Sequence, residues 1–513
     1  MVSTGQRTAT RLSRAHRWML AVSGLSVALV VAAMAALYSA LPGIAAETGV
    51  AQQQLTWVVD GYTLALACLV LPAGALGDRW GRRVVLIAGM AVFTLGSAAP
   101  LLFDGPIGLI AARAVAGVGA AFVMPSTLSL LTAGFPEERR GQAVGVWAGV
   151  AGSGGALGII GSGLLLQWLP WQSIFIGMTV IGALLLAASC TVSESIAAER
   201  PPLDLWGSVT VAAAVGLVVV AAIEAPARGW LDPLVLGTLC GGVAAAAVFV
   251  LIEVRTTHPL LDVRLFRDRG FGSGTVSLTM QFLVSFGLFM LLVQFLQLIL
   301  GYSPLLASLA MGPMIVPLVA VSLFTHRLVD RFGLRAVTFT GLTLVGGGLL
   351  AIARLDLSSG YLDVLGSLLV MSTGMGLSSA PATAAIVAGT PVAKHGVAAA
   401  VNDAAREIGA ALGIAIAGSV LAAGYSNHIA PALPRLPEAA RGPVGDSLAA
   451  ALQVADRAGP QAQPLIDFAK TAFLQGFQQA GTVLGILMPA AAVVIAAWAP
   501  GRPRRRATAR RPH

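Results

Sequence analysis

The sequence predicts an all-α membrane protein with fourteen transmembrane helices, and composition is the first reason. Of the 513 residues, 57% are hydrophobic and only 11% are charged, whereas an ordinary soluble domain is about 25% charged. A soluble globule of this size would lack the polar residues to cover its surface. Aromatic residues make up only 6% of the chain, while 60 glycines supply small residues that let helices pack closely in lipid. The composition therefore excludes a soluble enzyme.

The lengths of the charge-free runs give the number of helices. A transmembrane helix needs about 20 consecutive apolar residues, and several runs have that length without Asp, Glu, Lys or Arg. Two longer runs are interpreted as helical hairpins, broken near Pro170 and at 301–304. The predicted spans are 18–41, 55–76, 84–103, 106–130, 141–166, 171–191, 205–225, 232–252, 271–299, 305–324, 336–353, 361–389, 397–424 and 476–499.

The basic residues predict how the spans are oriented. With a cytoplasmic N-terminus, 24 of the 32 Lys and Arg residues fall inside, six fall outside and two lie within spans. This is the positive-inside pattern, so both termini are predicted to be cytoplasmic. The basic tails are interpreted as anchors at an anionic membrane surface rather than as nucleic-acid binding segments. The first span is too long for the apolar region of a secretory signal and lacks a small-residue cleavage site, so it is kept as a helix.

A repeated loop predicts the arrangement of the helices. The motif Asp-Arg-aromatic-Gly-x-Arg begins at Asp78, after the second span, and again at Asp330, after the tenth, 252 residues later. Two repeated six-helix bundles, spans 1–6 and 9–14, with spans 7–8 inserted between them, are typical of transporters with a site at the repeat interface. The predicted domains are a basic cytoplasmic tail (1–17), an N-terminal bundle (18–191), two inserted helices with flanking loops (192–254), a C-terminal bundle (255–499) with an outer loop (425–475), and a second basic tail (500–513).

Further motifs follow in order along the chain. The fourth span carries Leu109, Arg113, Gly117, Gly119, Ala120, Ala121 and Pro125. Residues 259–267 and the Arg-Glu-Ile-Gly sequence at 406–409 continue the series. With the repeated loops, this order resembles the major facilitator superfamily over nearly the whole chain, specifically its fourteen-span drug:proton antiporter branch. The resemblance implies that the proton gradient, rather than a cofactor, drives efflux of amphipathic cationic or neutral compounds by alternating access.

The two repeated loops are the candidate gating elements. In the first loop, Gly77 and Gly81 permit a tight turn, and Asp78 can cap the start of the third span. The resemblance implies a conformational latch, and a capped turn that anchors the inner side is an equally good structural interpretation. The gating candidates are Gly77, Asp78, Arg79, Gly81 and Arg82 in the first loop and Asp330, Arg331, Gly333 and Arg335 in the second.

Charged residues inside the predicted spans are the candidates for proton coupling, because a charge within a bilayer is costly and rare. Asp60, in the second span, is the first candidate for a coupling acid or a cation contact. Together with its neighbours Trp57 and Tyr62, it is also a candidate for lining the substrate cavity. Arg113 should face the protein interior; its family counterpart is implicated in proton coupling, whereas binding to backbone carbonyls would make it structural. Glu224, near the outer end of the seventh span, is either a solvated rim residue or a substrate contact.

Other polar and small residues within the spans are further candidates. Asp403 and Arg406 are spaced i,i+3 beside Glu407 and are predicted to form a structural ion pair. The amides of the ninth span line a cavity or bridge helices; these are Gln281, Gln294 and Gln297. Glycines of the fifth span predict close helix packing, although the proline of the family's antiporter signature is missing; these are Gly154, Gly158, Gly161 and Gly163.

The sequence therefore predicts a monomeric, proton-coupled multidrug exporter in a bacterial cell membrane, a source suggested by 30 Arg against 2 Lys. Its partners are small-molecule substrates, protons and the bilayer, with no nucleic acid. Export of one endogenous metabolite, antibiotic or lipid intermediate is the alternative, and a non-transporting sensor or scaffold is a weaker one. No motif for a nucleotide, a metal or a catalytic triad stands in a suitable context, so no enzyme activity, cofactor or metal is expected.

Overall fold

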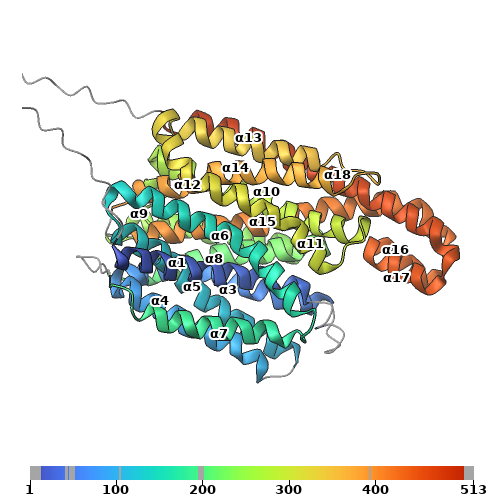
Figure 1. Cartoon of the computed structure of the whole chain (residues 1–513), viewed down its shortest axis with the longest axis horizontal. Helices are drawn as coiled ribbons and strands as arrows, with labels where there is room; N and C mark the ends of the chain where they lie inside the picture. Colours follow the sequence, from blue (N-terminus) through green and yellow to red (C-terminus); the bar gives the residue numbers. More distant parts are fainter. Residues whose placement is uncertain are drawn as a thin grey trace, which may run out of the picture.

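The computed structural model describes residues 13–40, 44, 52–102, 105–194, 202–391 and 394–501. Over these residues the chain is a bundle of helices without strands (Figure 1). Fourteen of the described helices are long and apolar enough to cross a membrane. The predicted fold class and number of spans are confirmed.

The first six spans form the N-terminal half. Within it α3 and α4 both pack against α5, α1 packs against α6, and α4 packs against α7. Small residues allow the helices to approach this closely. For example, a Cβ at Gly117 of α5 would collide with the backbone of Tyr62 in α3. The helices are α1 (Arg14–Ala35), α3 (Gln52–Trp80), α4 (Arg82–Ala98), α5 (Pro106–Gly134), α6 (Glu137–Leu165) and α7 (Gln172–Ser189).

The last six spans form the C-terminal half. α10 (Arg269–Gln294) ends in a π-helical turn, Phe295–Ile299, and α11 (Pro304–Met311) continues through a short 3-10 turn into α12 (Ile315–Phe332). Here α10 packs against α15, and α13 packs against α14 and α18. The remaining spans are α13 (Leu334–Ile352), α14 (Tyr361–Ala388), α15 (His395–Ile429) and α18 (Gln463–Trp498).

The segment predicted as an outer loop, 425–475, is mostly helical. α15 runs on to Ile429 and α18 already begins at Gln463. Between them, α16 (Glu438–Asp446) and α17 (Leu448–Ala458) form a small helical cap at one end of the bundle (Figure 1). The hydroxyl of Tyr425 donates to the carbonyl of Val444 at 2.8 Å, which joins the cap to α15.

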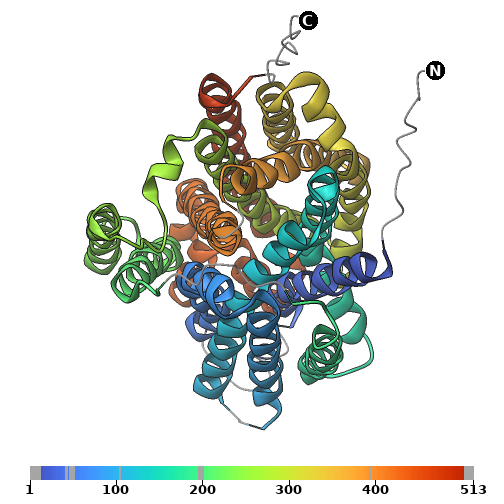
Figure 2. The same cartoon turned by 90° about the vertical axis from the view of Figure 1, so that its left-hand side faces the viewer.

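The two inserted helices, α8 (Leu205–Arg228) and α9 (Pro233–Arg255), pack against each other at the periphery of the bundle (Figure 2). α8 contacts both α3 of the N-terminal half and α15 of the C-terminal half. The chain returns to α10 through the 3-10 turn η3 (Val263–Arg267). The insertion therefore covers one line along which the two halves meet.

The halves touch at the end of the bundle where α1 begins and α18 ends, called here the terminal end; the cap lies at the opposite end (Figure 1). At the terminal end the backbones of Gly74 in α3 and Gly396 in α15 approach so closely that a Cβ on either would overlap the carbonyl of the other. α6 and α12 form the second contact, where a Cβ at Gly145 would lie 2.8 Å from the Ser322 carbonyl.

The glycines singled out in α6 pack against different neighbours. A Cβ at Gly158 would overlap the backbone of Ala32 in α1, and one at Gly154 would lie 2.9 Å from Val31. Gly163 faces Leu305 of the other half, with 3.0 Å available to a Cβ. Gly161 has no neighbour within 4 Å of this position, so the prediction that it packs closely is wrong.

Candidate functional site

Arg113, on α5, is buried at 1% exposure between α1 and α3. Its Nε donates to the Val58 carbonyl at 3.1 Å, and its Nη2 donates to the Ala33 carbonyl at 3.2 Å. The guanidinium carbon lies 4.3 Å from the centre of the Tyr62 ring, whose hydroxyl donates to the Val30 carbonyl at 2.8 Å. The backbone and the aromatic face stabilise a charge that would otherwise be costly at this depth. Arg113 therefore ties α5 to α1 and α3.

Asp60 lies beside this arginine. It is half-buried on α3, within electrostatic reach of Arg113 and of Glu224 on α8. The three residues predicted to take part in proton coupling thus share one charged neighbourhood, formed by α3, α5 and α8. Trp57, one turn before Asp60, is also half-buried. The sequence could not place Glu224 here, because contact between α8 and α3 depends on the tertiary packing of the insertion.

Glu224 is not a solvated rim residue. Its side chain is buried, and its Oε2 accepts a hydrogen bond from Arg228 Nε at 2.6 Å. That hydrogen bond raises the pKa of Arg228, which keeps the guanidinium charged. Arg228 is itself exposed, so the pair joins a buried acid to a solvated base one helical turn away.

A second charged group lies on α15, where Asp403, Arg406 and Glu407 are all buried. The Arg406 guanidinium carbon lies 4.8 Å from the centre of the Trp147 ring on α6 and 5.0 Å from that of Phe282 on α10. In the described part of the chain Arg406 has no ion pair within 4.0 Å, so the predicted pair with Asp403 is not formed. The aromatic faces hold the guanidinium in place of the neighbouring carboxylate.

Several polar atoms of this α15 group lack partners. Asp403 Oδ1 accepts from the amide of Asn402 at 3.0 Å, and Asn402 accepts from the Thr383 hydroxyl at 2.7 Å. Among the described residues no hydrogen bond reaches Asp403 Oδ2, Glu407 Oε2 or Arg406 Nε. A carboxylate oxygen that is buried without a hydrogen-bond partner is unfavourable. Binding of a proton or a cation would therefore stabilise these carboxylates. Glu407 also lies within electrostatic reach of Tyr62 in the other half.

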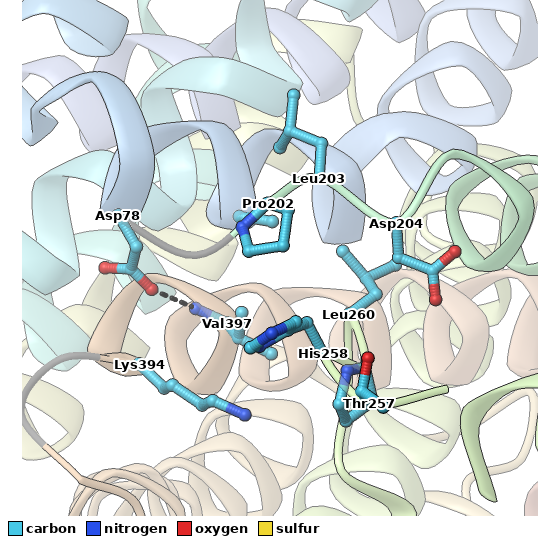
Figure 3. Close-up of a pocket in the computed structure, with 11 residues that line it drawn as sticks. Asp78, Pro202, Leu203, Asp204, Thr257, His258, Leu260, Lys394 and Val397 are labelled. Atoms are coloured by element: carbon cyan, nitrogen blue, oxygen red, sulfur yellow. Dashed lines mark hydrogen bonds between the residues drawn. The ribbon is translucent and has the colours of Figure 1, made fainter. Parts of the chain in front are cut away.

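Asp78 joins the two halves at the terminal end. Its Oδ1 lies 2.9 Å from Arg82 Nη2 and accepts from the Gly396 amide at 2.9 Å. Its Oδ2 accepts from the Val397 amide at 3.2 Å (Figure 3). The first N–H groups of a helix lack partners within it and favour an anion. Asp78 therefore caps α15 of the C-terminal half, and the prediction that it caps the third span is wrong. We call this contact the α15 latch.

The start of the third span is capped by another acid. The amide of Arg83 donates to Glu194 Oε1 at 3.1 Å, and its guanidinium donates to the Val192 carbonyl at 3.1 Å. Gly81 has a positive φ of 107°, and a Cβ there would lie 3.1 Å from the Glu194 carboxylate. This turn therefore requires glycine. Gly77 lies within the last turns of α3 rather than in the predicted turn, and Arg79 follows it at the helix end.

The second copy of the loop does not repeat the latch. Asp330, Arg331 and Arg335 are exposed, and Gly333 makes the turn between α12 and α13 with a φ of 85°. Arg335 donates through Nε and Nη2 to the Ala499 carbonyl, at 3.1 and 2.9 Å, beyond the end of α18. These bonds stay within the C-terminal half. The sequence repeat predicted two equivalent gating loops, and the structure shows that their contacts differ.

The amides of α10 have separate environments. Gln281 donates to the Ser379 hydroxyl at 2.5 Å and accepts from the Ser378 hydroxyl at 2.7 Å, so it bridges α10 and α14 rather than lining a cavity. Gln294 donates weakly to Met290 of its own helix, at 3.4 Å. Gln297 lies half-buried in the π-helical turn. Only Gln294 and Gln297 remain as candidates for a cavity lining.

These features define a membrane protein of two similar helical halves, with buried charges along the line between them and a latch at one end. Residues 23–414 match the Major Facilitator Superfamily, and the chain belongs to this family.

Two curated relatives and one solved structure are similar along most of the chain. The "Multidrug efflux pump LfrA" of Mycolicibacterium smegmatis is 33% identical over 95% of this chain and 96% of its own. The "Tetracenomycin C resistance and export protein" of Streptomyces glaucescens is 30% identical over 88% and 86%. The structure of the proton:xylose symporter XylE superposes with a TM-score of 0.59 at 16% identity, over 95% of this chain and 96% of that one. This structural likeness shows the shared fold.

Proposed function

We propose that this protein is a proton-coupled multidrug efflux transporter, which exchanges protons for amphipathic cationic or neutral compounds by alternating access. The observation that carries the proposal is the α15 group, in which unpaired Asp403 and Glu407 oxygens lie beside an Arg406 that contacts the opposite half. The names of the relatives support this substrate class.

The charge balance of the α15 group supports exchange. One guanidinium and two carboxylates leave an excess negative charge when all three are ionised. Buried in a largely apolar bundle, such a charge is stabilised by whichever positive species reaches it. A proton and a cationic substrate would therefore compete for, or alternate at, the same carboxylates. The faces of Trp147 and Phe282 beside them add surfaces for a flat, amphipathic compound.

Asp60 and Glu407 are our candidates for the coupling acids, one in each half. Asp60 neighbours Arg113, and Glu407 neighbours Arg406, so each half pairs a protonatable group with a fixed cation. Arg113, held by two carbonyls, keeps its position while Asp60 changes charge. Rocking of the halves changes both environments at once, which is the condition for coupling protonation to access.

The α15 latch supports a proposal about which side of the membrane is closed in this conformation. The predicted orientation places the terminal end in the cytoplasm of a bacterial cell, and the latch ties the halves together there. The structure then represents a form closed toward the cytoplasm, and opening requires Asp78 to release the α15 amides. Each chain contains both halves, so the monomer suffices as the transport unit.

Dye efflux from cells lacking their own pumps tests the proposal. Cells expressing the protein should export several cationic and neutral dyes, and collapsing the proton gradient should abolish this export. Cells expressing an Asp60→Asn, Glu407→Gln double variant at equal surface levels serve as the control and should behave like cells without the protein. Export that persists without a gradient, or no export across the panel, would refute the proposal.

Export of a single antibiotic or metabolite is the second candidate function, favoured by the similarity to the tetracenomycin export protein. The same panel separates the two functions. A specific exporter would leave every dye in place while lowering cellular sensitivity to one chemical class.

A further inference from the structure

Two carboxylates face each other at the base of the inserted helices. Asp204 caps α8, and its Oδ1 accepts from the Gly207 amide at 2.7 Å. Glu253, near the end of α9, is 3% exposed, and its Oε2 accepts from the Leu261 amide at 3.1 Å. The second oxygen of each, Asp204 Oδ2 and Glu253 Oε1, is buried and has no hydrogen-bond partner among the described residues.

Both unpaired oxygens converge on the same small space above Gly207. A Cβ built on Gly207 would lie 2.7 Å from Asp204 Oδ2 and would overlap Glu253 Oε1. Glycine at this position therefore leaves the room that lets the two carboxylates approach. Neither oxygen accepts a hydrogen bond in this space from any described residue.

The surrounding charges do not neutralise the pair. Asp204, Asp262 and Lys394 lie within electrostatic reach of Glu253, from the start of α8, the segment before η3 and the segment before α15. Three acids thus face one lysine. A Cβ on Gly207 would meet an oxygen of each carboxylate, so the two groups are close neighbours, and like charges this close disfavour ionisation of both.

We propose that Asp204 and Glu253 form a proton-binding site, in which one proton is shared between Glu253 Oε1 and Asp204 Oδ2. The proton comes from solvent, and its binding changes the charge of the pair from two negative charges to one. The other two oxygens keep their bonds to the Gly207 and Leu261 amides in both states. The pair offers a metal ion only two free oxygens, whereas Mg²⁺ and Ca²⁺ take six or more ligands.

The site adjoins a pocket that also contains the α15 latch. Asp204 and Leu260 form one side of this pocket, and Asp78, Lys394 and Val397 form the other (Figure 3). His258 lies between them. Loss of the shared proton would place two like charges together and push the start of α8 away from α9 and from the segment at Leu260. The proton therefore stabilises the packing of the inserted helices on the side of the pocket that faces the α15 latch.

Thermal stability as a function of pH tests the site on the purified full-length protein. Glu253→Gln and Asp204→Asn each keep the oxygen that accepts from a backbone amide and supply an amide N–H to the partner, so each mimics the protonated pair. Because the folded wild type binds a proton that the unfolded chain releases, its stability falls as pH rises. The melting temperature of wild type should therefore fall increasingly below that of either variant as pH rises.

Asp232→Asn is the matched control. Asp232 caps α9 at the other end of the insertion, where its Oδ1 accepts from the Leu234 amide at 2.9 Å. The melting temperature of the Asp232→Asn variant should differ from that of wild type by the same amount at every pH. Parallel pH curves for wild type, Glu253→Gln and Asp204→Asn would overturn the proposal.

Infrared spectroscopy supplies a second readout. The wild-type spectrum minus that of either variant should show the carbonyl band of a protonated carboxyl group, and this difference band should disappear at high pH. If the band is absent and Na⁺ or Mg²⁺ restores the stability of wild type at high pH, the ligand is a metal ion and the proposal is wrong. Neither readout requires transport, so failure of the proposed efflux function would leave this result unaffected.

Discussion

The guanidinium of Arg406, in the C-terminal half, lies 4.8 Å from the centre of the indole ring of Trp147, in the N-terminal half. The indole Nε1 in turn donates to the Thr127 hydroxyl at 3.1 Å, which fixes the ring within its own half. The buried guanidinium of one half thus contacts an aromatic ring whose orientation is fixed in the other half. Any rocking of the halves must change this contact, so it links charge in α15 to conformation.

Trp147→Leu should weaken this link. A desolvated cation–π contact contributes about 2 kcal/mol, and the variant removes it, whereas Trp147→Phe keeps a ring and loses only the bond to Thr127. Melting temperature and dye efflux should both fall in the order wild type, Phe, Leu. Equal values for the Leu and Phe variants would show that the ring does not interact with Arg406.

Asp78→Ala should open the α15 latch. The variant removes the carboxylate that pairs with buried Arg82, and removing one member of a buried ion pair costs about 3–5 kcal/mol. Spin labels at the exposed positions Val84 and Phe332, in a background without native cysteines, report the separation of the halves. The variant should show a longer and broader distance distribution.

Asp330→Ala is the control for the latch, because it removes the corresponding carboxylate of the second loop, which is exposed. The label distances in this variant should match those of wild type. An equal effect of the two substitutions would contradict the assignment of the latch to the first loop alone.

Arg113→Lys should impair the protein more than Tyr62→Phe. Lysine lacks the planar fork that reaches the Val58 and Ala33 carbonyls and stacks on the tyrosine. Tyr62→Phe loses only the bond to the Val30 carbonyl, which contributes about 1 kcal/mol. The comparison uses melting temperature and efflux at matched expression. A tolerated lysine would show that the charge alone is required.

Gly158→Ala should destabilise the packing of α6 on α1, because the new methyl group overlaps the backbone of Ala32. Overpacking of this kind costs about 1–3 kcal/mol. Gly161→Ala, with open space at the same atom, should be neutral or slightly stabilising. Melting temperatures that fall equally in both variants would contradict this packing.

Hydrophobicity predicted the spans well where helices end at charges or glycine. The predicted span 336–353 corresponds to Leu334–Ile352, and 205–225 corresponds to Leu205–Arg228. It gave no sign of α16 and α17 within 425–475, because these helices have only 9 and 11 residues and contain no apolar run of about 20 residues. Helical periodicity also gives no sign of the π-helical turn Phe295–Ile299.

The sequence predicts which residues form the candidate site but only some of the contacts that they make. The cost of a charge within a span singles out Asp60, Arg113 and Glu224, and packing brings them together. Sequence spacing suggested partners on the same helix, so it paired Asp403 with Arg406 and assigned Asp78 to the adjacent span. The contacts that the spacing could not indicate cross to the other half: Arg406 contacts Trp147, and Asp78 accepts from the amides of Gly396 and Val397. The sequence does not distinguish Glu253 from an ordinary charge at the end of a span.

Proton-driven transport by the purified protein in liposomes tests the central claim most directly. A cationic dye should move against an imposed proton gradient and stop when that gradient is collapsed. Glu407→Gln should still bind the dye but lose gradient-driven movement. Full gradient-driven movement in both Glu407→Gln and the Asp60→Asn, Glu407→Gln double variant would contradict the account, as would dye movement by wild type that ignores the gradient.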